Sequence, residues 1–111
     1  MHAMMREIKE SDWKLLRQLH SEALERFCKQ ILLEVDRINS GRAKSFHQKY
    51  LDIYAVLHQR DKEIAQAFNN PRRSTALIQL ASMKGRGLVT EDEFLRFSQE
   101  TQEVVDHMLG S

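Results

Sequence analysis

The sequence predicts an all-α protein, an up-down helical bundle built on a long antiparallel helix hairpin followed by two shorter helices. Apolar residues recur at steps of three and four over long stretches, which is the period of an amphipathic helix. Only four glycines and one proline interrupt the 111 residues, and 41% apolar with 30% charged residues is a balance typical of chains that fold. We expect residues 1–111 to form a single helical domain.

The first helix is expected over about residues 11–39. Ser11 is its predicted N-cap, and Asp12 follows in the first turn, where the helix dipole favours a negative charge. One apolar stripe then continues to Ile38. Gly41 predicts an end to the helix through a left-handed residue.

The second helix is expected over about residues 42–69, and we interpret it as the central helix of the fold. Its apolar stripe consists of Phe46, Tyr50, Ile53, Leu57, Ile64 and Phe68. Pro71 marks the end, because the residue before a proline is disfavoured in helical geometry. The short link between two long helices predicts an antiparallel hairpin.

The register of this hairpin follows from the position of its turn. With Ser40 and Gly41 at the centre of the turn, Trp13 lies opposite Phe68, and His20 lies opposite residues 60–62. Apolar residues then face apolar residues at nearly every layer except that of His20.

Two shorter helices complete the prediction. The third is expected over about residues 71–84, with the proline as its first residue and Asn70 as its cap. The fourth is expected over about residues 90–109, and Thr90 and Glu93 predict a capping box at its start.

The hairpin is predicted to be longer than the helices that cover it. The third helix extends only roughly 20 Å, about half the length of the hairpin, so the part near the turn is expected to stay open. The predicted partner interface there consists of Ile31, Val35, Ile38, Phe46 and Tyr50. An open apolar strip usually contacts a second copy or a partner, so we expect a homodimer or a partner protein. Alternatively, the fourth helix covers the strip within the monomer.

His20, Arg60 and Asp61 form the most specific polar layer in the predicted hairpin. A carboxylate facing a histidine inside a bundle holds the imidazole in one tautomer, which a general base or a pH switch requires. The same pair can instead fix the register of two helices. A catalytic reading also needs a concave pocket beside His20 and Asp61.

Charge is distributed unevenly along the chain. Residues 37–86 carry ten basic and three acidic side chains, whereas residues 87–111 carry one and six. Arg72, Arg73, Lys84 and Arg86 are the candidate contacts for an anion or a nucleic acid. The segment has no recognition-helix pattern and no aromatic residues placed for stacking among its basic residues, so solvated helix ends are the preferred explanation of these side chains.

Residues 87–94, GLVTEDEF, resemble the second half of an EF-hand calcium loop in the glycine, the central aliphatic residue, the last carboxylate and the following aromatic residue. The resemblance implies a loop that begins at Ser82 and has Lys84 and Arg86 at its third and fifth ligand positions. Calcium requires oxygen donors there, so calcium binding is excluded. The predicted capping box accounts for the same residues.

No other chemistry is indicated. Glu103 and His107 lie one turn apart but supply too few ligands for a zinc site, so we expect neither a metal nor a cofactor. Cys28, the single cysteine, lies inside a helix and cannot form an internal disulfide. No apolar run of about 20 residues is present, and residues 1–10 lack the apolar core of a secretion signal, so a cytoplasmic protein is expected.

We therefore expect a non-catalytic cytoplasmic interaction or regulatory module that acts through protein–protein contacts on its helix faces. The alternative is a nucleic-acid-binding protein that uses the basic segment 37–86. An enzyme is the third reading.

Overall fold

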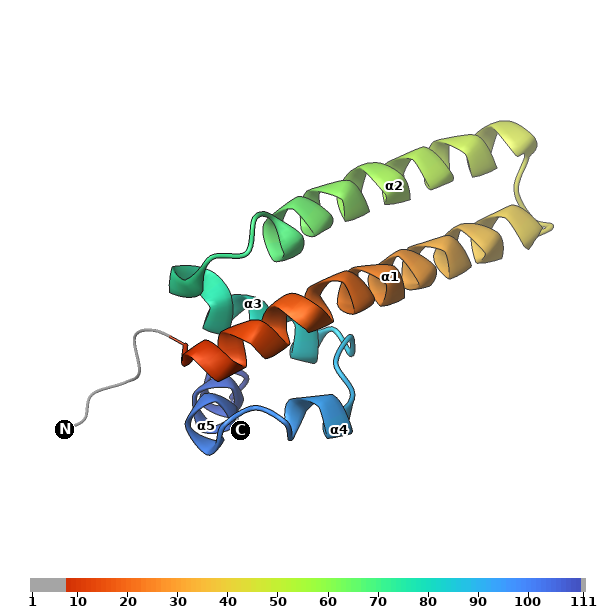
Figure 1. Cartoon of the computed structure of the whole chain (residues 1–111). Coiled ribbons are helices and arrows are strands. Elements are labelled where there is room, and N and C mark those ends of the chain that lie inside the picture. Colours follow the sequence, from red (N-terminus) through yellow and green to blue (C-terminus); the bar gives the residue numbers. More distant parts are fainter. Residues whose placement is uncertain (1–7, 111) are drawn as a thin grey trace.

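The computed structural model describes residues 8–110, and these residues confirm the all-α class because they form helices and no strand (Figure 1). The elements are α1 (Glu10–Ser40), α2 (Phe46–Phe68), the 3-10 helix η1 (Arg73–Thr75), α3 (Ala76–Gly85), α4 (Glu91–Phe94) and α5 (Gln99–Met108). We expect no secretion signal in residues 1–10, but most of this stretch, residues 1–7, lies outside the described residues. Within them, no helix combines the length and the apolar character needed to cross a membrane.

Helices α1 and α2 lie side by side and antiparallel, joined by residues 41–45 (Figure 1). The ends of α1 differ from the prediction. Lys9 is the N-cap instead of Ser11 and makes no side-chain cap. Gly41 is extended, with φ −63°, instead of left-handed. The Ser40 hydroxyl donates to the carbonyl of Asp36 at 2.7 Å and so satisfies a terminal carbonyl without a left-handed residue. Helix α2 begins after Ser45, whose side chain accepts from the backbone N–H of Gln48 at 3.1 Å.

The register of the two helices also differs from the prediction. Phe68 stacks on Phe27, with ring centroids 6.1 Å apart, and its carbonyl binds His20 instead of lying at the level of Trp13. The difference in helix length explains this register. Helix α2 has 23 residues against 31 in α1, and both start from the same link, so α2 ends about two turns before α1 does.

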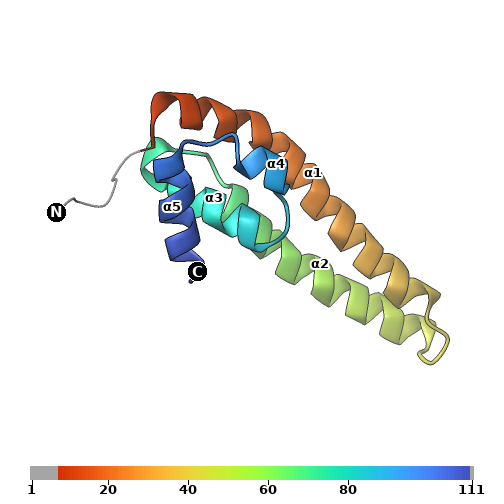
Figure 2. The ribbon, with the colours of Figure 1, turned by 90° about the horizontal axis from the view of Figure 1, so that it is seen from below.

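The buried core lies at one end of the hairpin. It contains α1 as far as Ile31, the last two residues of α2, and parts of α3, α4, α5 and the links between them. The main buried side chains are Leu16, Leu19, Ala23, Phe27, Phe68, Leu77, Leu80, Met83, Leu88, Phe94, Phe97 and Val105. Figure 2 shows α3, α4 and α5 gathered around the start of α1, at the end opposite the α1–α2 link.

The third predicted helix begins later than expected. Asn70 is left-handed, with φ 27°, a conformation that asparagine tolerates better than most residues, and the chain turns before η1 and α3 begin. Asn70 therefore does not cap a helix that starts at Pro71. At the other end, Gly87 has φ 75°, and Leu88 N–H donates to the carbonyl of Met83 at 2.9 Å in a Schellman motif.

The fourth predicted helix is divided into α4 and α5. The predicted capping box of Thr90 and Glu93 is present at the start of α4. The division occurs because Ser98 caps α5 and donates from its N–H and its hydroxyl to Asp12, at 2.9 and 2.6 Å. Thr101 donates to the same carboxylate at 2.7 Å. A side chain of α1 thus sets where α5 starts.

The part of the hairpin beyond the contact between Phe27 and Phe68, residues 28–66, is called the arm. It gives the molecule extents of 59 × 25 × 24 Å and a radius of gyration of 17.1 Å, against about 13 Å for a compact chain of this length. Helices α4 and α5 join the first half of α1 and α3, so they do not cover the arm as the alternative supposed (Figures 1 and 2). One side of the hairpin near its link is therefore open.

Replacing Asp12 with Ala should destabilise the fold strongly. Asp12 is 1% exposed, and its loss leaves two hydroxyls and one N–H without their acceptor. We expect the free energy of unfolding in urea to fall by about 3 kcal/mol. Asp36→Ala, an exposed change in the same helix, is the matched control and should stay within about 0.5 kcal/mol of the wild type. Equal effects of the two changes would contradict the assigned role of Asp12.

Candidate interaction surface

An apolar groove runs along the arm between α1 and α2. Its apolar walls are formed by Ile31, Leu32, Tyr54, Leu57 and Ile64, and its volume is about 590 Å³. Leu32 is 61% and Tyr54 is 62% exposed, and their place together in one groove is informative, because apolar side chains that are exposed singly are common on a folded monomer. This arm groove is therefore an unpacked apolar surface.

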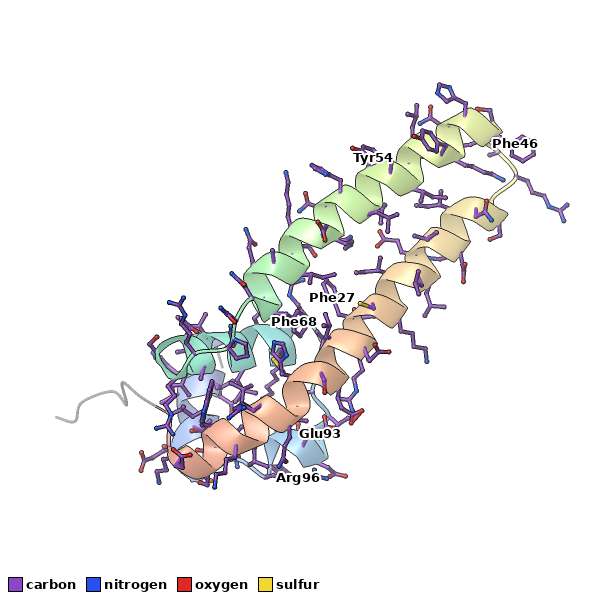
Figure 3. The ribbon with its side chains drawn as sticks, turned by 45° about the horizontal axis from the view of Figure 1, so that its top comes forward. Phe27, Phe46, Tyr54, Phe68, Glu93 and Arg96 are labelled. Atoms are coloured by element: carbon purple, nitrogen blue, oxygen red, sulfur yellow. The ribbon has the colours of Figure 1, made fainter. Side chains whose placement is uncertain are left out.

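The helical periods of α1 and α2 create this groove. Cys28, Ile31 and Leu32 lie on one face of α1 at steps of three and one, and Leu57 and Ile64 lie two turns apart on α2. Each helix turns part of its apolar face toward its neighbour and leaves the rest beside the gap. Figure 3 shows Phe46 and Tyr54 on the arm, far from the core in which Phe27 and Phe68 meet.

A charged network lies on another side of the same hairpin. Arg60 donates from Nε to Glu34 at 3.1 Å and from Nη1 to Glu63 at 2.7 Å, and Arg86 donates to Glu63 at 3.2 Å. The hydrogen bond from Arg60 to Glu34 raises the pKa of the guanidinium. Burial alone would raise the pKa of Glu63, but hydrogen bonds from Gln59 and Arg86 outweigh it and lower that pKa. The network links α1, α2 and the end of α3 through hydrogen bonds, whereas the walls of the groove are mainly apolar.

Only two of the five residues of the predicted partner interface are exposed. Phe46 is 88% and Tyr50 is 66% exposed, as an interface residue must be before binding. Ile31 is buried, and Val35 and Ile38 are half-buried, because these three residues turn toward α2.

The predicted polar layer does not assemble. His20 donates from Nε2 to the carbonyl of Phe68 at 3.0 Å and packs edge-on against its ring. Arg60 lies eight residues earlier on α2, about 12 Å along the helix, and pairs with Glu34 instead. The shifted register separates these residues. Asp61 lines the arm groove, whereas His20 is not among its lining residues.

Most of the candidate anion-binding residues are engaged in ion pairs. Arg73 pairs with Glu10, Lys84 with Asp106 at 2.7 Å, and Arg86 with Glu63, while Arg72 is exposed. Lys84 also lies 3.7 Å above the ring of Phe94, and Arg86 lies 5.2 Å from the ring of Phe27. These four side chains serve different contacts and do not converge on one site.

The segment that resembles part of an EF-hand has a structural role here. Glu93 accepts two hydrogen bonds from Arg26, at 2.7 and 2.8 Å, and Arg26 also donates to the carbonyl of Leu88 at 2.8 Å. The hydrogen bond from Arg26 lowers the pKa of Glu93 to about 2, with a further contribution from the N–H of Thr90. The carboxylate that would ligate the last calcium position thus clamps α4 to α1.

Among residues 8–110, no group of three or more histidine, cysteine or acidic side chains is arranged to hold a metal ion. Comparison of the chain with protein-family models, with curated proteins and with solved structures finds no match.

Sequence reasoning missed the exposure of Leu32 and Tyr54. The predicted apolar stripe of the second helix contains Ile53 and not its neighbour Tyr54; in the structure Ile53 is half-buried and Tyr54 is exposed. Tyr50, Tyr54 and Leu57 are spaced by four and three residues, an average of 3.5 residues instead of 3.6. This spacing is the sequence signal that predicts the exposure of Tyr54.

The clamp of Arg26 and Glu93 predicts an acid-sensitive stability. The folded-state pKa of Glu93 is about 2, against an ordinary value of 4.5. Its stabilisation is therefore complete above about pH 4.5 and is lost as the pH falls toward 2. Since Arg26 is partly exposed, we expect Glu93→Gln to cost about 2 kcal/mol in the free energy of unfolding at pH 7.

Urea titrations from pH 7 to pH 2 check this prediction. The wild type should lose stability over the acid window, and Glu93→Gln should show a flatter profile there. Glu91→Gln, an exposed change in the same helix, is the control and should follow the wild type. Parallel profiles for the wild type and Glu93→Gln would contradict the assignment.

Proposed function

We propose that this protein is a non-catalytic interaction module that binds another protein through the apolar side of its arm. The observation that supports this proposal is how little of α2 is buried. Only Ala67 and Phe68 are buried in a helix of 23 residues, although its apolar residues recur at helical spacing. An amphipathic helix gains most of its stability from packing its apolar face, and here most of that face remains open.

The chemistry of the arm groove supports a helical partner. A groove between two helices, lined by Leu32, Tyr54 and Leu57, accepts the apolar face of a third helix as a helix-in-groove contact. Exposed tyrosines suit such a contact, because they provide a large rigid ring with a polar end. A cytoplasmic location for this binding remains a prediction from the sequence.

Nucleic-acid binding through residues 37–86 receives less support. Arg73, Lys84 and Arg86 are held in ion pairs, and releasing them for phosphate would cost those contacts. Arg60 of the hairpin is likewise held in ion pairs with Glu34 and Glu63.

Introducing a charge into the arm groove should abolish protein binding. We expect Leu57→Glu to weaken association of the full chain at least tenfold, because the complex would then have to bury an unpaired carboxylate. Ile78→Glu is the matched control, since Ile78 is 63% exposed on α3 away from the groove. Association is measured by sedimentation of the purified chain and by quantitative pull-down of proteins from cells.

The wild type and Ile78→Glu should associate equally, and circular dichroism should show the same helix content in all three proteins. Unchanged association of Leu57→Glu would contradict the proposal. Salt-sensitive retention on immobilised RNA that is lost in Arg72→Glu would favour nucleic-acid binding instead.

A further inference from the structure

The arm ends in a basic pocket, which lies where α1, the link and α2 meet. Its basic lining residues come from the last turn of α1, from the link and from the start of α2: Arg37, Arg42, Lys44 and Lys49. The pocket has a volume of about 220 Å³, and its apolar lining is supplied by Ile38, Gly41 and Ala43. Between Arg37 and Leu51 the chain has no acidic residue. We call this cavity the link pocket.

Most of the positive charge of the link pocket is not compensated. Asp52 is the acidic residue in its lining, and it accepts hydrogen bonds from Lys44 at 2.6 Å and from Gln48 at 2.8 Å. Four basic side chains and one acidic side chain give the pocket a net charge of +3. Within residues 8–110, no salt bridge joins Arg37 or Arg42 to an acidic side chain. The pocket therefore attracts anions.

The lining of the pocket has hydrogen-bond donors left for a ligand. The ammonium of Lys49 donates to the carbonyl of Asn39 at 2.9 Å, and an ammonium has three N–H donors in all. The guanidinium groups of Arg37 and Arg42 each present a planar fork of donors that fits the oxygens of a phosphate. Like charges around one cavity repel each other, and a bound anion removes this repulsion. A terminal phosphate, with about two negative charges and three acceptor oxygens, matches both the charge and the donors.

We propose that the link pocket binds a terminal phosphate group, carried by a membrane lipid or by a soluble phosphate ester. The volume of about 220 Å³ is several times the share of one water molecule in the liquid, about 30 Å³, so the pocket has room for a phosphate group and little more. This site goes beyond the proposed function, because the link pocket and the arm groove have no lining residue in common.

The exposure of Phe46 favours a lipid as the carrier of the phosphate. Phe46 is the first residue of α2 and is 88% exposed, and its ring centroid lies 5.6 Å from Nζ of Lys49. Figure 3 shows Phe46 at the link end of the arm, far from the core. An apolar ring beside basic side chains enters the interface of a membrane while the basic side chains bind the headgroups. A soluble phosphate ester would leave this ring in water.

NMR titration of the full chain with glycerol 3-phosphate tests the pocket itself. We expect the wild type to bind it and the double variant Arg37→Ala/Arg42→Ala to bind it more weakly by about tenfold or more, because the two forks of donors are gone. The matched control is Lys29→Ala/Lys62→Ala, which removes two exposed positive charges from the arm outside the pocket. Its affinity should stay within about twofold of the wild type.

Vesicles distinguish the two sources of phosphate. Phosphatidylcholine vesicles that contain phosphatidic acid present the same terminal phosphate on a lipid, whereas vesicles of equal surface charge that contain phosphatidylserine present none. If a lipid is the source, the wild type co-sediments with the phosphatidic acid vesicles in preference to the others. Phe46→Ala then weakens this binding and leaves the affinity for glycerol 3-phosphate unchanged. If the source is a soluble ester, the chain binds glycerol 3-phosphate and neither kind of vesicle.

Three results would overturn the proposal. The first is that the wild type binds neither glycerol 3-phosphate nor the phosphatidic acid vesicles in preference to the phosphatidylserine vesicles. The second is an equal loss of affinity in the two double variants, which would reduce the effect to net charge. The third is retention on immobilised RNA alone that is lost in Arg37→Ala/Arg42→Ala, which would assign these side chains to nucleic-acid binding.

The substituted side chains are exposed and lie outside the core, so circular dichroism should show the helix content of the wild type in every variant. Leu57→Glu should leave the affinity for glycerol 3-phosphate unchanged, because Leu57 lines the arm groove and not the link pocket. Failure of phosphate binding is therefore distinguishable from failure of the proposed function.

Discussion

Helix α1 is longer than the core that can pack against it, and this mismatch shapes the molecule. A helix of 31 residues extends about 46 Å, whereas the molecule is about 25 Å across in its two shorter directions. The core reaches only as far as Ile31 along α1, so the remaining turns continue into the arm. Helix α2 follows α1 back along the arm and reaches the core only at its last two residues.

The core end is held by polar contacts as well as by apolar packing. Asp12 joins the first turn of α1 to the start of α5, and Arg26 joins the middle of α1 to α4. Both contacts are charge-assisted hydrogen bonds, the kind that is strong and specific in direction; Asp12 is fully buried, and Arg26 is partly exposed. They orient the short helices on α1, which leaves the arm free of contacts with α4 and α5.

Local sequence signals predicted the helices but not every boundary. The periodicity of α1 and α2 and the capping box at Thr90 depend on neighbouring residues, and they appear as predicted. The break between α4 and α5 at Ser98 depends on Asp12, which is 86 residues away in the sequence. A pattern of neighbouring residues cannot indicate a partner at that separation. Asn70 likewise departs from the prediction, because its left-handed turn serves the entry of α3 into the core.

The candidate surface was predictable in part. Phe46 and Tyr50 are apolar at helical spacing in an uncovered region, so their exposure follows from helix lengths alone. The position of His20 depended on the register, and an error of about two turns moved it from Arg60 to Phe68. Side-chain orientation at Tyr54 depended on which of two adjacent residues faces α1, which pattern reasoning resolves only to about a quarter turn.

The contact between Asp12 and Ser98 has a further consequence for the order of folding. It joins segments from opposite ends of the chain, so a long loop must close before the contact forms. Hairpin contacts such as that between Glu34 and Arg60 close a loop of only 26 residues and form with less entropic cost. We therefore expect the arm to take shape early and the core to close last, which leaves the groove exposed to other chains throughout folding.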